Sequence, residues 1–239
     1  MEIILFEKLD STNTYAKQNI KTLADRTVIS ANIQTNGYGR FERTWIDLGR
    51  DNIYMTFILK PSDKIDTVHA NLTQYLSVCL CRQLEEMGLS PQIKWPNDVL
   101  LNGKKVCGIL AETVIRGSML KGIVLGIGIN LNASAESLEE IDRPATSINI
   151  ELKAKIDKQE FMANLIESFF ENYDQFLKNG FKSIKNDYEK RASFLNQQLK
   201  VSVFNIIKEG LSKRLDDDGA LILIDKTGKE EKINMGEII

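Results

Sequence analysis

Residues 93–112 read IKWPNDVLLNGKKVCGILAE and carry the strongest local structure signals in the chain. Pro96 has no amide hydrogen and disfavours the helical conformation for the residue before it, which predicts an extended segment. The pair Asn102-Gly103 strongly predicts a tight hairpin, because both residues must adopt positive φ. The stretch therefore predicts two short antiparallel strands that flank this turn.

The return strand places a cation beside apolar residues. With a strand period of two, Lys105, Cys107, Ile109 and Ala111 share one face, and Gly108 lies on the other. A lysine on a rigid hairpin suits an anionic ligand, and a glycine inside a strand allows close approach to the backbone. An Asn-Gly turn with lysines also occurs in ordinary soluble hairpins, so this feature alone does not decide the function.

Composition restricts the class of protein. The chain has 239 residues, a net charge of −2 and three cysteines. This length suits one medium domain and a small one, and the charge provides no basic footprint for nucleic acid. No apolar run reaches membrane-span length, and the first residues predict a strand and no signal peptide. We therefore expect a reduced, cytoplasmic protein with no disulfide framework.

Polar residues follow the first expected strand. Ser11, Thr12 and Asn13 are typical helix-starting residues, and capping a helix would by itself explain them. Their hydroxyl and amide groups, together with the free amides of a helix N-terminus, can also hold a small polar head group such as a urea-like ring.

A glycine-rich loop spans residues 34–45, QTNGYGRFERTW. A Gly-x-Gly pair alone is weak evidence, but this loop also carries Arg40 and Arg43 and is flanked by aromatic residues. Arginine suits bidentate recognition of carboxylate and phosphate groups. Such a loop can also close over a ligand and exclude water.

The rest of the chain predicts a mixed fold. The only histidine, His69, is expected at the surface, which excludes a histidine-dependent triad or metal site. Residues 121–132 predict a strand that is buried on both faces. Gly126 and Gly128 leave space on one of these faces, and Asn130 places a polar amide at the end of the same strand. Further strands are expected at 2–9, 27–33 and 52–59, and helices at 66–87, 157–180 and 181–192.

The last segment has a different character. From residue 194 onward the chain shows short alternating strands and turns, which predict a small β-barrel. The expected domains are therefore 1–193 and 194–239. Asp216, Asp217 and Asp218 could suggest a cation site, but a solvated turn explains them more simply.

Together these motifs resemble the biotin–protein ligases, that is, the biotin–[acetyl-CoA-carboxylase] ligases. The resemblance rests on segments that are spread over nearly the whole chain: 11–13, the glycine loop, 94–111, 126–132, 145–148, 219–221 and 236–238. It implies an α+β fold, with a class II synthetase-like catalytic domain built on a mixed sheet and a C-terminal SH3-like barrel. It also indicates a short form without the N-terminal DNA-binding domain of some relatives.

The resemblance implies a two-step reaction. Biotin and MgATP form biotinyl-5′-AMP and pyrophosphate, and a lysine of a biotin carboxyl carrier protein or domain then takes the biotinyl group. Mg²⁺ enters with ATP as a co-substrate, and no tightly bound cofactor or metal ligand in the protein is expected. The partners are therefore biotin, ATP and the carrier, with no nucleic acid or membrane, and exposed strand edges are compatible with a homodimer.

Site residues follow from the same resemblance. Lys105, Arg40 and Lys94 are expected to be catalytic, with Arg40 and Lys105 facing the carboxylate and the α-phosphate. Biotin is assigned to Ser11, Thr12, Asn13, Gln34, Gly37, Tyr38, Gly39, Arg40, Lys105 and Gly108. The nucleotide is assigned to Arg40, Arg43, Trp45, Lys94, Asn97 and Asn130.

Two positions depart from the family. The glycine loop commonly has arginine where this chain has Tyr38, and glycine where it has Glu42. One fewer cation and one more anion predict looser retention of the adenylate.

Two alternatives remain. One is a lipoate or octanoate ligase or transferase, which shares this fold, and the other is a non-catalytic biotin-binding module. The Gly-Tyr-Gly-Arg loop and the Lys-Trp-Pro-Asn-Asp block favour biotin, and the pair Arg40 and Lys105 favours catalysis. A DNA-binding regulator is the weakest candidate.

Overall fold

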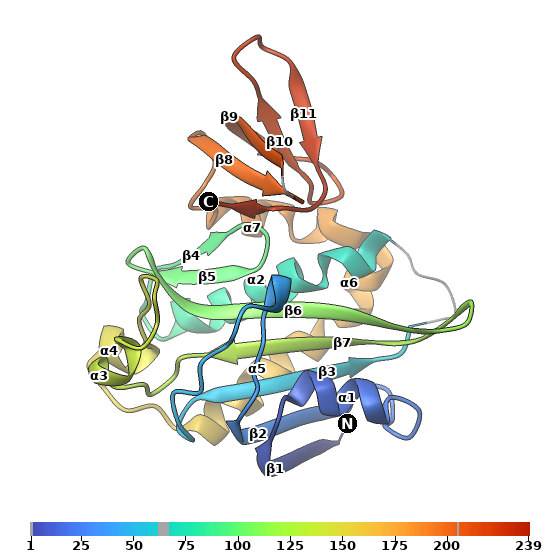
Figure 1. The fold of residues 1–239 in the computed structure, drawn as a ribbon, viewed down its shortest axis with the longest axis vertical. Coiled ribbons are helices and arrows are strands. Elements are labelled where there is room, and N and C mark those ends of the chain that lie inside the picture. The colour runs from blue at the N-terminus through green and yellow to red at the C-terminus, as the bar shows by residue number, and fades with distance from the viewer. Residues whose placement is uncertain (1, 62–66, 205) are drawn as a thin grey trace. The chain divides into compact units, whose positions relative to one another are not determined.

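Alternating and continuously apolar segments form strands, as their hydrophobic period predicts. The computed structural model describes residues 2–61, 67–204 and 206–239 (Figure 1). The strands of the first sheet are β1 (Ile3–Leu9), β2 (Val28–Gln34), β3 (Ile53–Leu59), β4 (Pro91–Lys94), β5 (Asp98–Leu101), β6 (Lys104–Arg116) and β7 (Met119–Ile129). Those of the second are β8 (Gln198–Val203), β9 (Ile206–Leu215), β10 (Leu221–Ile224), β11 (Glu230–Ile233) and β12 (Glu237–Ile238).

The first sheet contains both parallel and antiparallel strand pairs, whereas the strand pairs of the second sheet are antiparallel. The first is seven-stranded, in the order β1-β2-β3-β7-β6-β5-β4, and the second is five-stranded, in the order β11-β10-β9-β8-β12. β1 and β2 pair in parallel, whereas β3 pairs antiparallel with both β2 and β7. The second sheet is antiparallel. This architecture confirms the expected α+β class, with a mixed sheet and a small C-terminal β-structure.

The helical segments lie between these strands. They are α1 (Thr12–Asn19), η1 (Arg40–Glu42), η2 (Thr67–Asn71), α2 (Leu72–Glu86), α3 (Ala135–Leu138), α4 (Ile148–Leu152), α5 (Lys158–Glu171), α6 (Tyr173–Asn179), η3 (Gly180–Ser183) and α7 (Lys185–Lys190). Within the described ranges, no helix is both long enough and apolar enough to cross a membrane.

The chain divides into two compact units. One comprises Met1–Asp66 and Gly103–Ile166, and the other comprises Thr67–Asn102 and Glu167–Ile239. The expected boundary between residues 193 and 194 stays a prediction.

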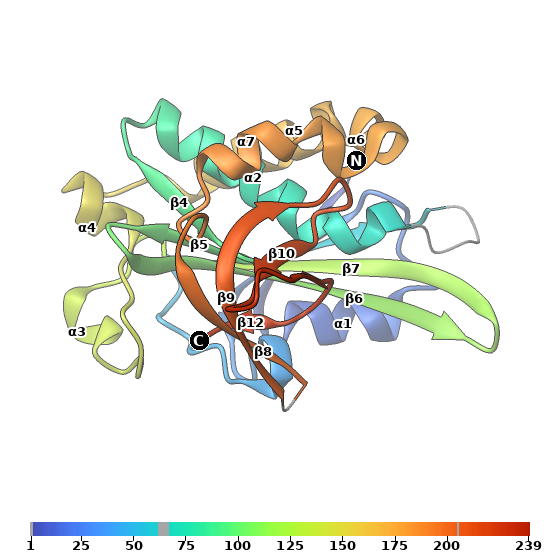
Figure 2. The same cartoon turned by 90° about the horizontal axis from the view of Figure 1, so that it is seen from above.

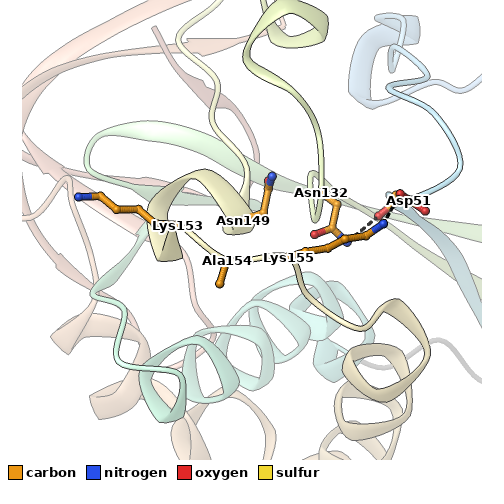
Figure 3. Close-up of a pocket in the computed structure, with 6 residues that line it drawn as sticks. All are labelled: Asp51, Asn132, Asn149, Lys153, Ala154 and Lys155. Atoms are coloured by element: carbon orange, nitrogen blue, oxygen red, sulfur yellow. Dashed lines mark hydrogen bonds and ion pairs between the residues drawn. The ribbon is translucent and has the colours of Figure 1, made fainter.

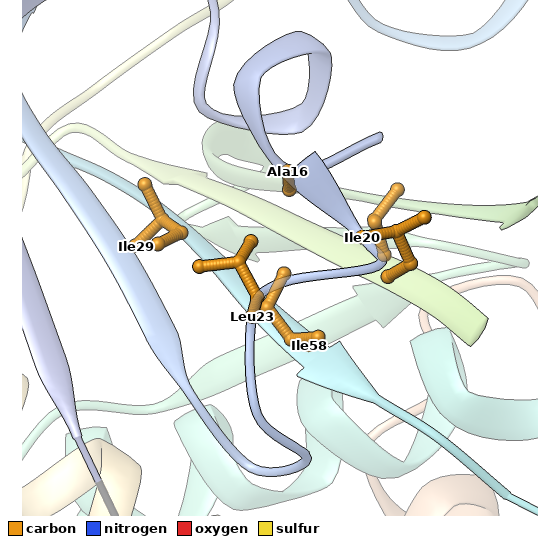
Figure 4. Close-up of a cluster of buried hydrophobic side chains, with 6 residues drawn as sticks. Ala16, Ile20, Leu23, Ile29 and Ile58 are labelled. Atoms are coloured by element: carbon orange, nitrogen blue, oxygen red, sulfur yellow. The ribbon is translucent and has the colours of Figure 1, made fainter. Parts of the chain in front are cut away.

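In the first unit, α1 covers one face of the sheet (Figure 1). Ala16 and Ile20 on this side pack with Leu23, Ile29 and Ile58 in a buried cluster (Figure 4). Full burial of each large aliphatic side chain contributes about 1.5–3 kcal/mol. This contact fixes the N-terminus of α1 over the strands that carry the candidate site.

In the second unit, α2 and α7 lie side by side (Figure 2). Arg191, only 7% exposed, donates to both carboxylate oxygens of Glu85 at 2.8 and 2.6 Å. Asp187 of α7 accepts hydrogen bonds from Arg82 of α2. Burial would raise the pKa of Asp187, but the hydrogen bond and charge of Arg82, with the charge of Arg191, lower this pKa below its ordinary value.

The lowered pKa predicts how Asp187 affects stability across pH. Its contribution is fully present above the ordinary aspartate pKa of 3.8 and is lost as the pH falls through the lower folded value. Because the carboxylate is partly solvated, we expect Asp187→Asn to lower the free energy of unfolding by about 1 kcal/mol at pH 7. Denaturant titrations should show this difference at pH 7 and a smaller one near pH 3, and an equal difference at both values would contradict the expectation.

Several expectations for the helices need correction. The segment expected as one helix over 157–180 is two helices, because Asn172, with φ −114° and ψ 8°, leaves the helical conformation between them. His69 is buried, at 8% exposure, and not at the surface. The helix expected from Asp66 begins outside the described residues, and α2 itself starts at Leu72. Gly88, with φ +84°, follows α2 as expected for a residue that ends a helix.

The turn expected at the centre of the motif is present. Asn102 has φ 50° and Gly103 has φ 74°, the positive values that a type I′ turn requires. The residues that return along β6 reach the first unit, where the candidate site lies.

Candidate active site

Three glycines form the floor of the candidate site, where β6 and β7 pair. Gly108 lies opposite Gly128, and Gly126 lies two residues earlier on β7. A Cβ atom at Gly126 would lie 2.8 Å from Cγ of Asn13, and one at Gly128 would lie 2.6 Å from Cζ2 of Trp45. Glycine is required at these positions because the side chains of Asn13 and Trp45 lie directly on the strand backbone.

The predicted polar residues at the start of α1 lie together and are buried. Ser11 caps the helix, and its Oγ accepts from an amide of the first turn at 3.4 Å. Thr12 donates through its backbone N and its Oγ1 to Oε1 of Gln34, at 2.7 and 3.0 Å. Thr56 of β3 donates from Oγ1 to Oδ1 of Asn13 at 2.6 Å. Because each side chain is held by another, the group is preorganised around the floor.

Glu112 on β6 joins three segments, and the sequence reasoning missed its role. Its Oε2 accepts from Nδ2 of Asn13 at 2.9 Å and from the hydroxyl of Tyr38 at 2.8 Å. Its Oε1 pairs with Nζ of Lys17 at 2.7 Å. Strand period could have placed Glu112 on the face of Gly108, but its partners lie 74 to 99 residues away in the chain.

The pKa values in this cluster keep its donors protonated. Burial is the largest cause that raises the pKa of the Tyr38 hydroxyl, and the nearby carboxylate raises it further. Burial would lower the pKa of Lys17, but hydrogen bonds with Glu112 and Tyr38 outweigh it and raise that pKa. At neutral pH, Tyr38 therefore keeps its proton and donates a hydrogen bond, and Lys17 carries a positive charge beside the carboxylate.

The glycine loop is folded back on itself. The backbone N of Trp45 donates to the carbonyl of Gly37 at 2.9 Å, and that of Gly39 donates to the carbonyl of Arg43 at 2.8 Å. Phe41 and Glu42 at the tip both have φ 56°, in the left-handed region that glycine favours. The tip is therefore strained at both Phe41 and Glu42.

Two predicted arginines lie at this tip. The Cζ atoms of Arg40 and Arg43 lie 5.0 and 5.7 Å from the ring centroid of Phe41. Phe41 is itself 59% exposed, so the two guanidinium groups share an exposed aromatic ring.

The end of the Lys105 side chain lies beside Gly108 and Trp45, although strand period predicted that Lys105 shares a face with Cys107. Its Nζ lies 5.5 Å from the ring centroid of Trp45 and 3.2 Å from the position of a Cβ on Gly108. Lys105 therefore does not share a face with Cys107 and Ile109. Pairing of β6 with β7 begins only at Cys107, whereas Lys105 forms an isolated parallel bridge with Ala145.

Asn130 lies at the end of β7 and is buried. Its Nδ2 donates to the carbonyl of Thr146 at 3.0 Å, and its backbone carbonyl accepts from Ile148 at 2.9 Å. The amide thus holds the segment that leads into α4, a structural role that the sequence did not indicate.

Lys94 and Asn97 belong to the second unit. Between them, Trp95 is 2% exposed, and its Nε1 donates to the carbonyl of Gly219 at 3.2 Å. Gln74 of α2 donates to the same carbonyl at 3.0 Å. Trp95 therefore anchors the backbone that carries Lys94 and Asn97.

Other polar features lie away from this cluster of residues. A pocket of about 360 Å³ is lined by Asp51, Asn132, Asn149, Lys153, Ala154 and Lys155 (Figure 3). It contains none of the predicted site residues, and Lys155 in it pairs with Asp51 at 3.2 Å. Among the described residues, no group of three or more His, Cys, Asp and Glu is placed to hold a metal ion.

The acidic turn is neutralised by lysines. Asp216 and Asp218 pair with Lys232 at 2.8 and 2.7 Å, and Asp217 pairs with Lys182 at 3.0 Å. These are exposed ion pairs of a surface turn.

Comparisons with known proteins fit this geometry. Residues 5–130, more than half of the chain, match the Biotin/lipoate A/B protein ligase family. The biotin–[acetyl-CoA-carboxylase] ligase of Paracoccus denitrificans is 30% identical over 232 residues, which cover 95% of each chain. The chain belongs to the biotin protein ligase family. The bifunctional ligase/repressor BirA of Bacillus subtilis is 30% identical over 92% of this chain and 69% of its own length.

Solved structures of biotin protein ligases support the same assignment. The biotin protein ligase from Aquifex aeolicus, in complex with biotin and ATP, superposes with a TM-score of 0.85 and 27% identity. The match covers 100% of this chain and 97% of that one. The fold of this biotin protein ligase therefore extends over both units of the chain.

Proposed function

We propose that this biotin protein ligase activates biotin with ATP as biotinyl-5′-AMP and transfers the biotinyl group to a lysine of a biotin carboxyl carrier protein or domain. The observation that carries the proposal is the position of Lys105. Its ammonium nitrogen lies 3.2 Å from the position of a Cβ on Gly108 and 5.5 Å from the ring centroid of Trp45. The same unit also holds the polar N-terminus of α1. We infer a cytoplasmic location for this reaction.

The head group of biotin is proposed to bind at α1. Its ureido ring presents two N–H donors and one carbonyl acceptor, which match the mixed donors and acceptors of Ser11, Thr12, Asn13 and Gln34. These side chains are between 3% and 8% exposed, so a ligand there would be largely removed from water. The glycines of β6 and β7 let the side chains of Asn13 and Trp45 lie directly on the strand backbone, which holds these two proposed ligand-binding residues in place.

Activation brings two anions together. A carboxylate oxygen of biotin attacks the α-phosphorus of ATP, a phosphorus–oxygen bond forms, and pyrophosphate leaves. Lys105 and Arg40 are proposed to offset the negative charge that the carboxylate and α-phosphate share in the transition state. Closure of the glycine loop, with Gly37, Tyr38 and Gly39, would keep water from the mixed anhydride.

The nucleotide contacts are proposed from the resemblance. Trp45 would cover the adenine, and Arg43 and Asn130 would lie beside the nucleotide. Lys94 and Asn97 are proposed to help with the phosphates or with the Mg²⁺ ion that enters with ATP, and for the ion Asn97 offers an amide oxygen. In this role Mg²⁺ would neutralise phosphate charge.

The second step needs no nucleophile from the enzyme. The amine of the carrier lysine attacks the carbonyl carbon of the adenylate, an amide bond forms, and AMP leaves with its phosphate. The proton of the attacking amine is released as the amide forms. The acceptor is proposed to be the carrier domain of a carboxylase.

The decisive experiment combines the protein with ATP, labelled biotin and an apo carrier domain. Biotin-dependent release of pyrophosphate followed by label on the carrier lysine is the expected result. Lipoate in place of biotin tests the other branch of the matched family, and greater pyrophosphate release with lipoate would overturn the substrate assignment. Binding of biotin with no pyrophosphate release would instead identify a non-catalytic module.

A further inference from the structure

Tyr38 is one of the residues through which the glycine loop contacts the body of the first unit, and its side chain departs from the pattern that the resemblance implies. Tyr38 donates from its hydroxyl to Oε2 of Glu112 at 2.8 Å. The same oxygen accepts from Asn13 at 2.9 Å. One carboxylate therefore contacts both the residue proposed to hold biotin and the loop proposed to cover it.

We propose that Glu112 is a positioning residue of the ligase, which orients the amide of Asn13 toward biotin and, through Tyr38, holds the glycine loop closed over the adenylate. This inference rests on the proposed function. In this role, the hydroxyl of Tyr38 helps to retain the adenylate. The missing positive charge at position 38, in contrast, predicts looser retention.

The charge balance around Glu112 supports this role. Lys17 lies 2.7 Å from Oε1 and 5.2 Å from the ring centroid of Tyr38. The positive charge of Lys17 therefore offsets the negative charge of the Glu112 carboxylate. The same carboxylate accepts hydrogen bonds from two neutral donors, Asn13 and Tyr38. Hydrogen bonds to a charged acceptor are about twice as strong as those between neutral groups.

The amide of Asn13 is held in one orientation. Its Oδ1 accepts from Thr56, and its Nδ2 donates to Glu112. A reversed amide would place a donor against the Thr56 hydroxyl and an acceptor against the carboxylate. Glu112 thereby determines which atoms of Asn13 remain available to a ligand.

Two substitutions separate the two effects. Tyr38→Phe removes only the hydroxyl and leaves the ring beside Lys17, so it should release the loop and leave Asn13 oriented. Glu112→Gln affects both, because either orientation of the new amide points N–H groups at Lys17 or at Asn13 and Tyr38. Tyr15→Phe is a matched control, since the ring of Tyr15 packs on Phe6, outside these contacts.

The loop can be measured without catalysis, by trypsin cleavage after Arg40 and Arg43. We expect Tyr38→Phe and Glu112→Gln to speed this cleavage by about 10-fold, the effect of one lost hydrogen bond to a charged group. The double variant should be cleaved no faster than Glu112→Gln, because both changes remove the same contact. Tyr15→Phe should be cleaved at the wild-type rate, and melting temperatures would reveal any general unfolding.

Ligase measurements complete the test. Tyr38→Phe should raise the dissociation rate of biotinyl-5′-AMP by about 10-fold and leave the KM for biotin within about 2-fold, whereas Glu112→Gln should raise both. If an active Tyr38→Phe protein showed unchanged rates of trypsin cleavage and of adenylate dissociation, the proposed role of the Tyr38–Glu112 contact would be wrong. Absence of biotin-dependent pyrophosphate release in the wild type would overturn the proposed function, and the cleavage result would still judge the contact.

Discussion

Replacing Lys105 with methionine should lower the rate of biotin adenylation by about 100-fold to 1,000-fold, the range for losing one preorganised charge-stabilising group. Lys105 is half-buried, and its Nζ lies against Gly108 and 5.5 Å from the ring centroid of Trp45. A cation in this partly dehydrated position interacts more strongly with developing negative charge than it would in water. Methionine keeps an unbranched side chain that is one atom shorter, and it removes the charge and the N–H donors of the ammonium group.

The measurement is biotin-dependent exchange of pyrophosphate into ATP. If Lys105 acts mainly in the transition state, kcat should fall much more than the KM for biotin rises. Lys104→Met is the matched control, because Lys104 is the neighbouring residue on β6 and its side chain is exposed. We expect this control to exchange pyrophosphate at the wild-type rate. Exchange by Lys105→Met within about 3-fold of wild type would remove Lys105 from the catalytic group.

Local signals predicted much of the fold. The Asn102-Gly103 turn depends on two backbone angles, and the strands β3 and β7 depend on predominantly apolar segments. The break at Asn172 was missed because the apolar spacing continues across it, and spacing does not report the conformation of one residue. For the last segment the sequence predicted short strands as a group and not the bounds of each one, and β9 mixes charged, glycine and apolar residues with no clear alternation.

The sequence indicated individual residues of the candidate site, but it did not indicate most of the contacts between them. Thr12 and Asn13 were indicated by a local signal, the start of a helix, whereas Gln34 was assigned only through the resemblance. Thr12 and Gln34 are joined by a hydrogen bond, all three residues are buried, and their binding of biotin stays a prediction. The partners Glu112 and Lys17 could not be found this way, since their contact joins residues 95 positions apart. The face of Lys105 was predicted wrongly because strand period gives only the direction in which a side chain leaves the backbone, whereas the end of this long side chain lies beside Gly108.

The second large effect is expected at the floor of the site. Gly126→Ala would place a Cβ 2.8 Å from Cγ and 2.9 Å from Nδ2 of Asn13, distances that side chains do not tolerate. Because Asn13 is 5% exposed and held by Thr56 and Glu112, its amide must move and lose these hydrogen bonds. We expect a loss of about 1–3 kcal/mol in the free energy of unfolding. Biotin affinity should fall about 100-fold, as expected for an ångström-scale displacement of a binding group.

A double-mutant cycle decides whether Asn13 is the cause. Asn13→Ala removes the atoms that the new methyl group would meet, so in that background Gly126→Ala should cost less than about 0.5 kcal/mol. Denaturant titration gives the stabilities, and isothermal titration with biotin gives the affinities. Gly39→Ala serves as the control for stability alone, because a Cβ there would lie 3.8 Å from its nearest neighbour. If Gly126→Ala were equally destabilising with and without the Asn13 side chain, the amide would not lie on β7, and the proposed place of the biotin head group would be wrong.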